Sequence, residues 1–578
     1  MRRSLPHFFQ KYLSPSTPPP RTLQRRFAPG DDTTKKRVIV IGGGHNGLIT
    51  SAYLAKNKNL DVLLLERRDL VGGCAVTEEI YPGVKASRAS YVAGLLRPRI
   101  IEELELEKRR GLTFLPRKTT SFTPCDPEGR DSGKYLRLCD DNDKTHRSIS
   151  QFSARDADAF AAYEEFVGRC RDVLQPFLDR PIPSELNTRT VRDVAALARE
   201  LYPLRNDVLP FLHLVTKSAS RTLDSWFESD ILKATLACDA CIGNGAGVDE
   251  MGTGYALLHL VMGETSGRKG VWSYVEGGMG AISTAVGEVA RERGVEIVTG
   301  VEVEEIVVSD GRVGKKKVDG VRLSDGSVVE ADAVVSNATP HHTFLELLKD
   351  LSALDESTRR ALGAQDYSGG CMKINCVTNA LPEFTCFPTH GNVGPPHLGT
   401  IHFEDSMAQL QTAARDAKIG TNPKRPLIEM AIPTSVDTTL APQGTHVVQF
   451  FVQYTPYHLN DTSKSWDDIK EAYADTVMAQ VEKYCPGFTQ SIIHRDVLSP
   501  RDLERVFGLH EGNIYHGAHG IDQVGFWRPL FGWAGHRCPS VNGLYLCGAG
   551  CHPGGGVMGA SGRNAATVIL SDFQQGFL

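Results

Sequence analysis

The chain has 578 residues, of which 41% are hydrophobic and 23% charged, and its net charge is −5. This length exceeds one ordinary globular domain several-fold, so we expect at least two domains. No basic block outside the N-terminal residues favours nucleic acid, and no run approaches the roughly 18 to 20 apolar residues of a membrane span. We therefore predict no nucleic-acid partner and no transmembrane segment, leave peripheral membrane contact open, and find no pattern that indicates an oligomeric state.

The first 30 residues differ from the rest. They contain six basic residues and no acidic one, and Pro15 and Pro18 to Pro20 oppose regular structure. An arginine-rich, acid-free segment with hydroxyl side chains is typical of an organelle transit peptide. Arg25-Arg26-Phe27-Ala28 is similar to a matrix-processing site. We predict that residues 1–35 are a transit peptide and that the mature protein lies in the mitochondrial matrix; a disordered arm is the alternative.

A dinucleotide-binding unit follows. Val38 to Ile41 form an apolar run typical of a buried parallel strand, a helix is expected over about 48–56, and a second strand ends at Glu66. The G-x-G-x-x-G turn between them allows close approach of a pyrophosphate, and the helix start offers free N–H groups. An acid about 20 residues further on can bind ribose hydroxyls. The predicted cofactor-binding residues of this unit are Gly42, Gly43, Gly44, Asn46, Gly47 and Glu66.

Two further segments extend this unit. Arg67 and the paired Gly72 and Gly73 follow Glu66 directly. Near the C-terminus, an apolar run predicts another buried strand, and it is followed by a glycine-dense loop and a helix over about 561–570. A loop without side chains lets a planar ring lie against the backbone. The two ends of the chain are therefore predicted to enclose one cofactor.

These motifs resemble the carotenoid and phytoene desaturase branch of the glutathione-reductase-like flavoproteins. The resemblance implies FAD as cofactor and an α/β fold: a Rossmann-like FAD-binding domain, with a parallel sheet and helices on both faces, plus an inserted mixed α+β substrate domain. It also implies further cofactor-binding residues, namely Arg67, Gly72, Gly73, Val303, Gly548, Ala549, Gly555, Gly556, Val557 and Met558. Val303 lies on the strand that passes the adenine in those relatives.

The alternation of elements predicts how the domains interleave. Between about 281 and 336 a helix and several strands continue the FAD-binding pattern, whereas helical stretches such as 157–173 and 469–484 mix with strand-like runs such as 447–454. We predict FAD-binding segments at 36–100, 271–344 and 501–578, and substrate-domain segments at 101–270 and 345–500.

The 13 cysteines show no disulfide framework. Cys238 and Cys241 form a C-x-x-C, and Cys371 and Cys376 a C-x₄-C, yet no second dinucleotide unit accompanies them as an NAD(P)H-driven reductase requires. We expect core thiols and predict no metal site. The histidines of the glycine-rich stretch, His510, His516 and His519, are predicted to be surface-loop residues.

Three functions remain open. The first is an FAD-dependent oxidoreductase whose flavin accepts hydride from, or isomerises, an apolar or amine-like small molecule; the sequence names no catalytic residue. The second is a non-catalytic binding or regulatory protein on the same scaffold that affects mitochondrial function, and the third is a dithiol enzyme that uses the cysteine pairs. Desaturases usually carry F-D-x-G where this chain has Val84-Lys85-Ala86-Ser87-Arg88, which argues against a carotenoid substrate.

Overall fold

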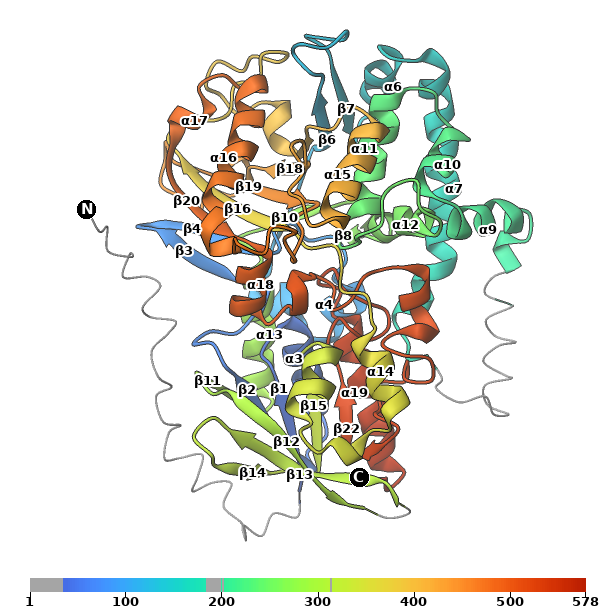
Figure 1. Cartoon of the computed structure of the whole chain (residues 1–578), viewed down its shortest axis with the longest axis vertical. Coiled ribbons are helices and arrows are strands. Elements are labelled where there is room, and N and C mark those ends of the chain that lie inside the picture. Colours follow the sequence, from blue (N-terminus) through green and yellow to red (C-terminus); the bar gives the residue numbers. More distant parts are fainter. Residues whose placement is uncertain (1–34, 183–198, 200–201, 312–313, 578) are drawn as a thin grey trace.

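The computed structural model of the chain describes residues 35–182, 199, 202–311 and 314–577. The predicted transit peptide, apart from Lys35, lies outside these residues. The described chain forms a lower and an upper part in Figure 1, and the chain passes between them several times.

The lower part is built on a five-stranded parallel sheet in the order β11-β2-β1-β15-β22. The strands are Glu296–Thr299, Leu60–Glu66, Lys36–Ile41, Ala333–Ser336 and Leu544–Leu546. Their cores are continuous apolar runs because both faces of the sheet are covered. The predicted parallel α/β sheet is therefore confirmed.

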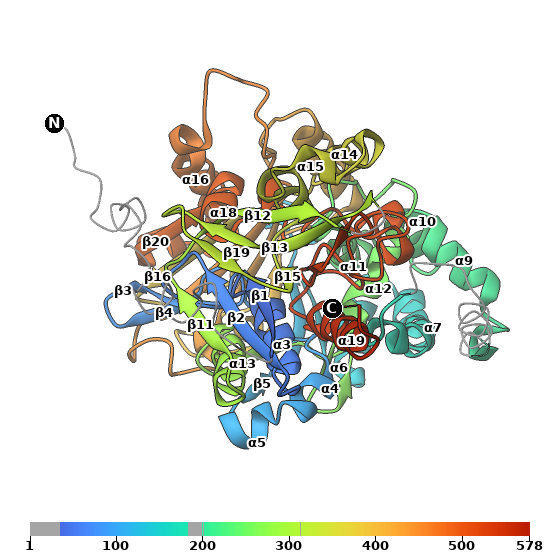
Figure 2. The ribbon, with the colours of Figure 1, turned by 90° about the horizontal axis from the view of Figure 1, so that it is seen from below.

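Different layers cover the two faces of this sheet (Figure 2). Helices α3 (His45–Leu54), α13 (Gly280–Glu292) and α19 (Ala560–Gln574) pack on one face against side chains such as Val38 and Val40. On the other face lie the antiparallel strands β12 (Val303–Asp310), β13 (Lys316–Leu323) and β14 (Val328–Glu330), with β21 (Val541–Asn542), the π-helical turn η4 (His342–Leu347) and α14 (Glu356–Gly363). The second face thus carries more strand than the helical cover expected from the sequence.

The upper part contains a seven-stranded mixed sheet in the order β20-β16-β19-β18-β17-β6-β7. The strands are Ile492–Leu498, Met372–Thr378, His446–Gln453, Leu427–Ala431, Thr400–His402, Thr119–Pro124 and Tyr135–Cys139. Strands β17 and β6 pair in parallel, and this pairing joins the two sequence segments of the sheet. Helix α16 (Trp466–Tyr484) packs on it through Trp466 and Val477, and α7 (Ala154–Leu178) and α11 (Asp230–Cys241) form a helical layer beside it.

The remaining elements are short. The helices are α4 Pro98–Glu103, α5 Leu106–Arg110, α6 Asn142–Ser150, α9 Val208–Thr216, α10 Ala219–Asp224, α12 Ala256–Val261, α15 Met407–Lys418, α17 Phe488–Ser491 and α18 Pro500–Phe507. The strands are β3 Thr77–Tyr81, β4 Val84–Ser87, β5 Phe114–Pro116, β8 Glu264–Thr265, β9 Arg268–Lys269 and β10 Ser273–Val275.

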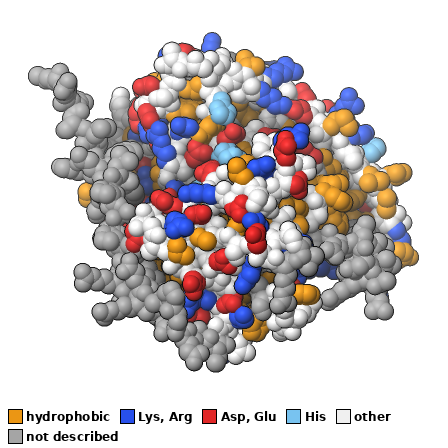
Figure 3. All heavy atoms as spheres, turned by 60° about the horizontal axis from the view of Figure 1, so that its bottom comes forward, with side chains coloured by type: hydrophobic (Ala, Val, Ile, Leu, Met, Phe, Trp, Pro, Cys, Tyr) orange, Lys and Arg blue, Asp and Glu red, His pale blue; other side chains and the backbone are white. Residues whose placement is uncertain are grey.

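Within the described residues, no helix combines the length and apolarity needed to cross a membrane. Figure 3 shows acidic and basic side chains intermixed on one face, with hydrophobic side chains gathered toward its right-hand side. Large apolar side chains exposed on the surface include Leu209 on α9 and Phe531, at 71% and 69% exposure. Peripheral membrane contact stays a prediction.

The first and last helices meet across the length of the chain. The Thr50 hydroxyl in α3 donates a hydrogen bond to the Gly562 carbonyl oxygen at 3.0 Å, and the Gly562 amide donates to Asn46 Oδ1 at 3.3 Å. A Cβ at Gly562 would overlap the Asn46 carbonyl oxygen and lie 3.1 Å from the Asn46 Cα. Only glycine permits this approach of two backbones.

We expect Gly562→Ala to lower the free energy of unfolding, because the added methyl separates α3 from α19. The matched control is Gly168→Ala in the middle of α7, where the nearest atom to a new Cβ is the end of the Arg171 side chain at 3.6 Å. That control should be neutral or stabilise the protein by up to about 1 kcal/mol through helix propensity. Thermal and urea unfolding of both variants test this; equal effects of the two substitutions would contradict it.

Candidate functional site

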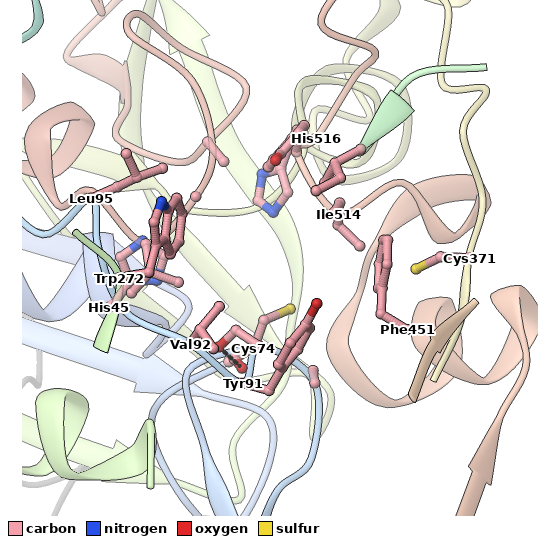
Figure 4. A pocket seen from close by; sticks show the side chains of 18 of the residues that line it. His45, Cys74, Tyr91, Val92, Leu95, Trp272, Cys371, Phe451, Ile514 and His516 are labelled. Carbon is pink, nitrogen blue, oxygen red and sulfur yellow. Dashed lines mark hydrogen bonds between the residues drawn. The ribbon is translucent and has the colours of Figure 1, made fainter. Parts of the chain in front are cut away.

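One cavity of about 960 Å³ connects the glycine-rich turn after β1 with the seven-stranded sheet. Figure 4 shows His45, Leu95 and Trp272 on one side of it and Phe451 and Cys371 on the other. The cavity therefore has two ends, a dinucleotide end in the lower part and a polar end in the upper part.

The dinucleotide end contains most of the cofactor-binding residues that the sequence predicts. Those that line the cavity come from all three predicted FAD-binding segments. They are Gly42, Gly44, Asn46, Glu66, Arg67, Gly73, Val303, Ala549, Gly556 and Val557.

The other predicted residues lie behind this wall. The Gly72 amide donates to the Gly43 carbonyl oxygen at 2.8 Å, and the Arg97 amide donates to the Met558 carbonyl oxygen at 3.1 Å. Gly47, Gly548 and Gly555 allow close packing, because a Cβ on each would overlap Gly42, Asn337 and Tyr515 respectively. These residues shape the wall and do not line it.

The backbone at this end forms a cradle. A Cβ on Gly44 would lie 2.7 Å from Asn337 Nδ2, and a Cβ on Gly73 would lie 3.1 Å from the Gly44 Cα. Glu66 Oε2 accepts a hydrogen bond from the Gly43 amide at 2.7 Å, and Oε1 accepts one from the Arg68 amide at 2.8 Å. Each carboxylate oxygen keeps a second lone pair for a ribose hydroxyl. The acceptor pair of Glu66 and the bare backbone fit the ribose and pyrophosphate of a dinucleotide.

Asn337 and two histidines at this end were not predicted as site residues. Asn337 follows β15 and lines the cavity, and its amide donates to the Gly42 carbonyl oxygen at 3.4 Å. His45 Nε2 and His516 Nδ1 are buried without hydrogen-bond partners, and burial lowers the pKa of His516 to about 3. The signal for Asn337 was its place at the carboxyl end of a parallel strand, where ligands of such sheets bind.

The prediction that His516 and His519 are surface-loop residues is wrong. His519 is only 4% exposed, its ring stacks on Tyr515 at 4.3 Å, and His516 lines the cavity. The segment that carries these histidines folds inward because Asn513 Oδ1 accepts hydrogen bonds from the Tyr515 and Gly517 amides, at 2.9 and 3.1 Å. His510 is also half-buried, stacked on His341 at 3.7 Å.

The polar end contains buried ionisable groups from distant parts of the chain. Lys373 lies on β16, Glu429 on β18 and Asp239 on α11, and all three line the cavity with Tyr91 and Arg117. The Tyr91 hydroxyl donates a short hydrogen bond to Glu429. Lys373 Nζ lies 4.6 Å from the centre of the Tyr91 ring and has no hydrogen-bond partner.

Arg117 anchors the neighbouring wall. Its Nη1 donates to the Thr400 hydroxyl at 2.6 Å, and its Nε donates to the Trp272 carbonyl oxygen at 3.2 Å. The guanidinium is therefore held at the cavity wall by two neutral acceptors rather than by a carboxylate. A fixed positive charge results at this end.

Burial controls the protonation of the polar end. It lowers the pKa of Lys373 to about 7, and it raises the pKa of Glu429 and Asp239, the latter well above its ordinary value. A lysine with such a pKa can exist as a neutral amine that accepts a proton. The carboxyl groups can bind a cationic group of a ligand and become ionised when they do so.

Sequence reasoning missed these residues, although a signal was present. Lys373 and Asn375 interrupt the otherwise apolar run Cys371 to Cys376, and Glu429 interrupts the run Leu427 to Ala431. An ionisable residue in the middle of a fully buried strand requires a partner, so it marks a site. No pattern within either strand or within α11 indicated that these three elements face the same cavity.

The cysteine pairs behave as predicted for core thiols. Cys238 and Cys241 are buried on α11, and each thiol donates to a carbonyl of its own helix, at 3.3 and 3.2 Å. Cys371 and Cys376 are an odd number of positions apart in an extended segment and pack in different clusters, so they point away from each other. All the cysteines are free. Neither predicted pair forms the exposed dithiol that a relay enzyme uses.

Comparison with known proteins agrees with this geometry. A family of NAD(P)-binding Rossmann-like domains matches residues 40–99, and the flavin containing amine oxidoreductases match residues 135–374. Pyridine nucleotide-disulfide oxidoreductase domain-containing protein 2 of Rattus norvegicus is 44% identical over 549 residues, covering 92% of each chain. A lycopene-forming phytoene desaturase of Pseudescherichia vulneris is 26% identical over 77% of this chain and 82% of its own.

A solved structure shows the same fold. An oxidoreductase from Methanosarcina mazei superimposes with a TM-score of 0.57 at 17% identity, over 93% of this chain and all of its own. The resemblance to the desaturase branch is thus confirmed, together with the Rossmann-like fold. The chain belongs to the family of pyridine nucleotide-disulfide oxidoreductase domain-containing protein 2, within the flavin oxidoreductases.

Proposed function

We propose that the protein is an FAD-dependent oxidoreductase of the mitochondrion that oxidises a small molecule carrying an amine. The observation that supports it is one continuous cavity that joins Glu66 and the glycine-rich turn to Lys373, Glu429 and Asp239. Cofactor and substrate ends are continuous, so a bound substrate reaches the cofactor without passing through solvent.

FAD is the form of flavin that the dinucleotide end favours. Glu66 is suited to ribose hydroxyls and its charge opposes a 2′-phosphate, while Gly44 and Gly73 leave room for a pyrophosphate. Val303, Ala549, Gly556 and Val557 would contact the remaining parts of the cofactor. Bound FAD would supply the hydride-accepting centre.

The polar end favours the amine-like substrate over the apolar one. A hydrocarbon such as a carotenoid would leave Lys373 Nζ, which has no hydrogen-bond partner among the described residues, against apolar atoms, which costs several kcal/mol. An ammonium group would instead pair with the carboxyl groups of Asp239 and Glu429. Neutral Lys373 can then accept a proton released from the substrate nitrogen.

The first test is an absorption spectrum near the flavin band, followed by an anaerobic screen of primary and secondary amines for bleaching. We expect a yellow protein that releases FAD on denaturation.

Asp239→Asn should raise KM by roughly 10- to 100-fold, since a charge-assisted hydrogen bond contributes about 1.5–3 kcal/mol. The matched control is Asp230→Asn at the exposed start of the same helix, which should not change KM. Bound flavin without turnover of any amine would favour the binding-protein alternative, and a colourless folded protein would refute the proposal.

Lys373 gives a pH-dependent prediction. The unfolded chain protonates this lysine below about 10.5, but the folded protein does so only below about 7. Lys373 therefore lowers the free energy of unfolding by a growing amount as pH falls from 10.5 to about 7. Below pH 7 the amount no longer changes, because the lysine is then protonated in both the folded and the unfolded chain. Lys373→Met should raise the free energy of unfolding by up to a few kcal/mol at or below pH 7, with the gain vanishing toward pH 10.5.

The control is Lys470→Met, which removes a lysine paired with Asp502 at 2.8 Å and should not stabilise the protein. Thermal unfolding over this pH range measures both. A pH-independent effect of Lys373→Met would contradict the assigned protonation.

The mitochondrial location rests on the basic, acid-free composition of residues 1–30. Replacing its six basic residues by glutamine should move a fluorescent fusion of the full chain from mitochondria to the cytosol. The flavin content of the purified variant should not change. Unaltered mitochondrial location of this variant would exclude residues 1–35 as the targeting signal.

A further inference from the structure

Three ligand-type side chains meet at the wall of the polar end, with His402 on the cavity side. They are Cys238 on α11, His402 at the end of β17, and Glu404 just after that strand. Cys238 Sγ lies 3.6 Å from Glu404 Oε2, and His402 Nδ1 lies 4.0 Å from the same oxygen. One sulfur, one nitrogen and one oxygen, all within 4.8 Å of one another, thus face a common point.

The group is fully enclosed and incompletely satisfied. Cys238 and Glu404 are 0% exposed and His402 is 5% exposed, yet His402 Nδ1 has no hydrogen-bond partner. A buried imidazole nitrogen without a partner is costly. His402 also lines the cavity, so the group is reachable from there.

The backbone holds the carboxylate in place. The Ile428 amide donates to Glu404 Oε1 at 2.5 Å, and the Phe403 amide donates to Oε2 at 3.2 Å. These bonds come from β18 and from the residue that follows β17, and they hold the carboxylate next to Cys238. A pre-oriented ligand of this kind is what a metal site requires of its surroundings.

We propose that Cys238, His402 and Glu404 bind a divalent transition-metal ion of the Zn²⁺ type. A thiolate, a carboxylate and a neutral imidazole together balance a charge of +2 in a buried place. Tetrahedral Zn²⁺ with these ligands has ligand–ligand separations of roughly 3.4 to 3.6 Å. The Cys238–Glu404 separation of 3.6 Å already matches, whereas the His402–Glu404 separation of 4.0 Å and the Cys238–His402 separation, which is within 4.8 Å, would have to shorten when the ion binds. Binding would release the thiol and carboxyl protons and give His402 Nδ1 its missing partner.

The ligand set also limits the role of the ion. Three protein ligands leave a fourth position for water or another small ligand. The mixed soft and hard donors favour Zn²⁺ over Mg²⁺ or Ca²⁺. We predicted no metal site from the sequence because Cys238 is distant in sequence from His402 and Glu404, and no spacing motif links the three residues.

The test uses the full chain, stripped with a chelator and titrated with Zn²⁺ against a chromophoric competitor, and separately with Co²⁺. We expect one equivalent to bind, with thiolate-to-Co²⁺ charge-transfer absorption. Cys238→Ser should abolish that absorption and weaken Zn²⁺ binding at least a hundredfold. The matched control is Cys241→Ser, a buried thiol on the same helix that is not part of the group, and it should bind as the unchanged protein does.

Glu404→Gln provides a second variant that keeps the shape of the side chain, with folding checked by circular dichroism. It should weaken Zn²⁺ binding while the flavin spectrum is unchanged, which separates this site from the proposed oxidoreductase function. Absence of stoichiometric binding to the unchanged protein, or equal loss in the Cys238→Ser and Cys241→Ser variants, would overturn the assignment.

Discussion

The hydrogen bond from the Gly43 amide to the Glu66 carboxylate is the contact on which the dinucleotide end depends. It joins the turn after β1 to the end of β2, so the two central strands present their carboxyl ends as one edge. Gly72 then bonds to Gly43, and Asn337 bonds to Gly42, so that chain from two of the three FAD-binding segments surrounds the same turn. Without the bond to Glu66 the glycine-rich turn would lack the partner that sets its direction.

The elements close to this turn could be predicted from the sequence because their signals are local. The strand Lys36–Ile41 is an apolar run, the glycines have no Cβ where two backbones approach, and the acid ends the next strand. The C-terminal strand and loop have the same kind of pattern. Resemblance to a known family added Val303, whose position on β12 no local pattern indicates.

The polar end could not be predicted in the same way. Lys373, Glu429 and Asp239 come together only because β16 and β18 flank β19 in one sheet and α11 packs beside it. That pairing depends on contacts between residues far apart in sequence, which periodicity does not encode. His516 and His519 were misjudged for a related reason: a glycine-rich stretch suggests a surface loop unless its fold against a second distant loop is known.

The order of strands has a consequence for how the chain folds. The lower sheet is completed by β22, and α19 packs on α3, so both depend on the last 40 or so residues of the chain. The upper sheet likewise needs β6 to pair with β17 across a long intervening stretch that includes strands β11 and β15 of the lower sheet. The lower sheet therefore cannot be completed until β22 has been synthesised, long after its other four strands. The edge of β15 that pairs with β22 must therefore stay unpaired while the intervening residues are made, and we expect slow folding that depends on chaperones to suppress aggregation.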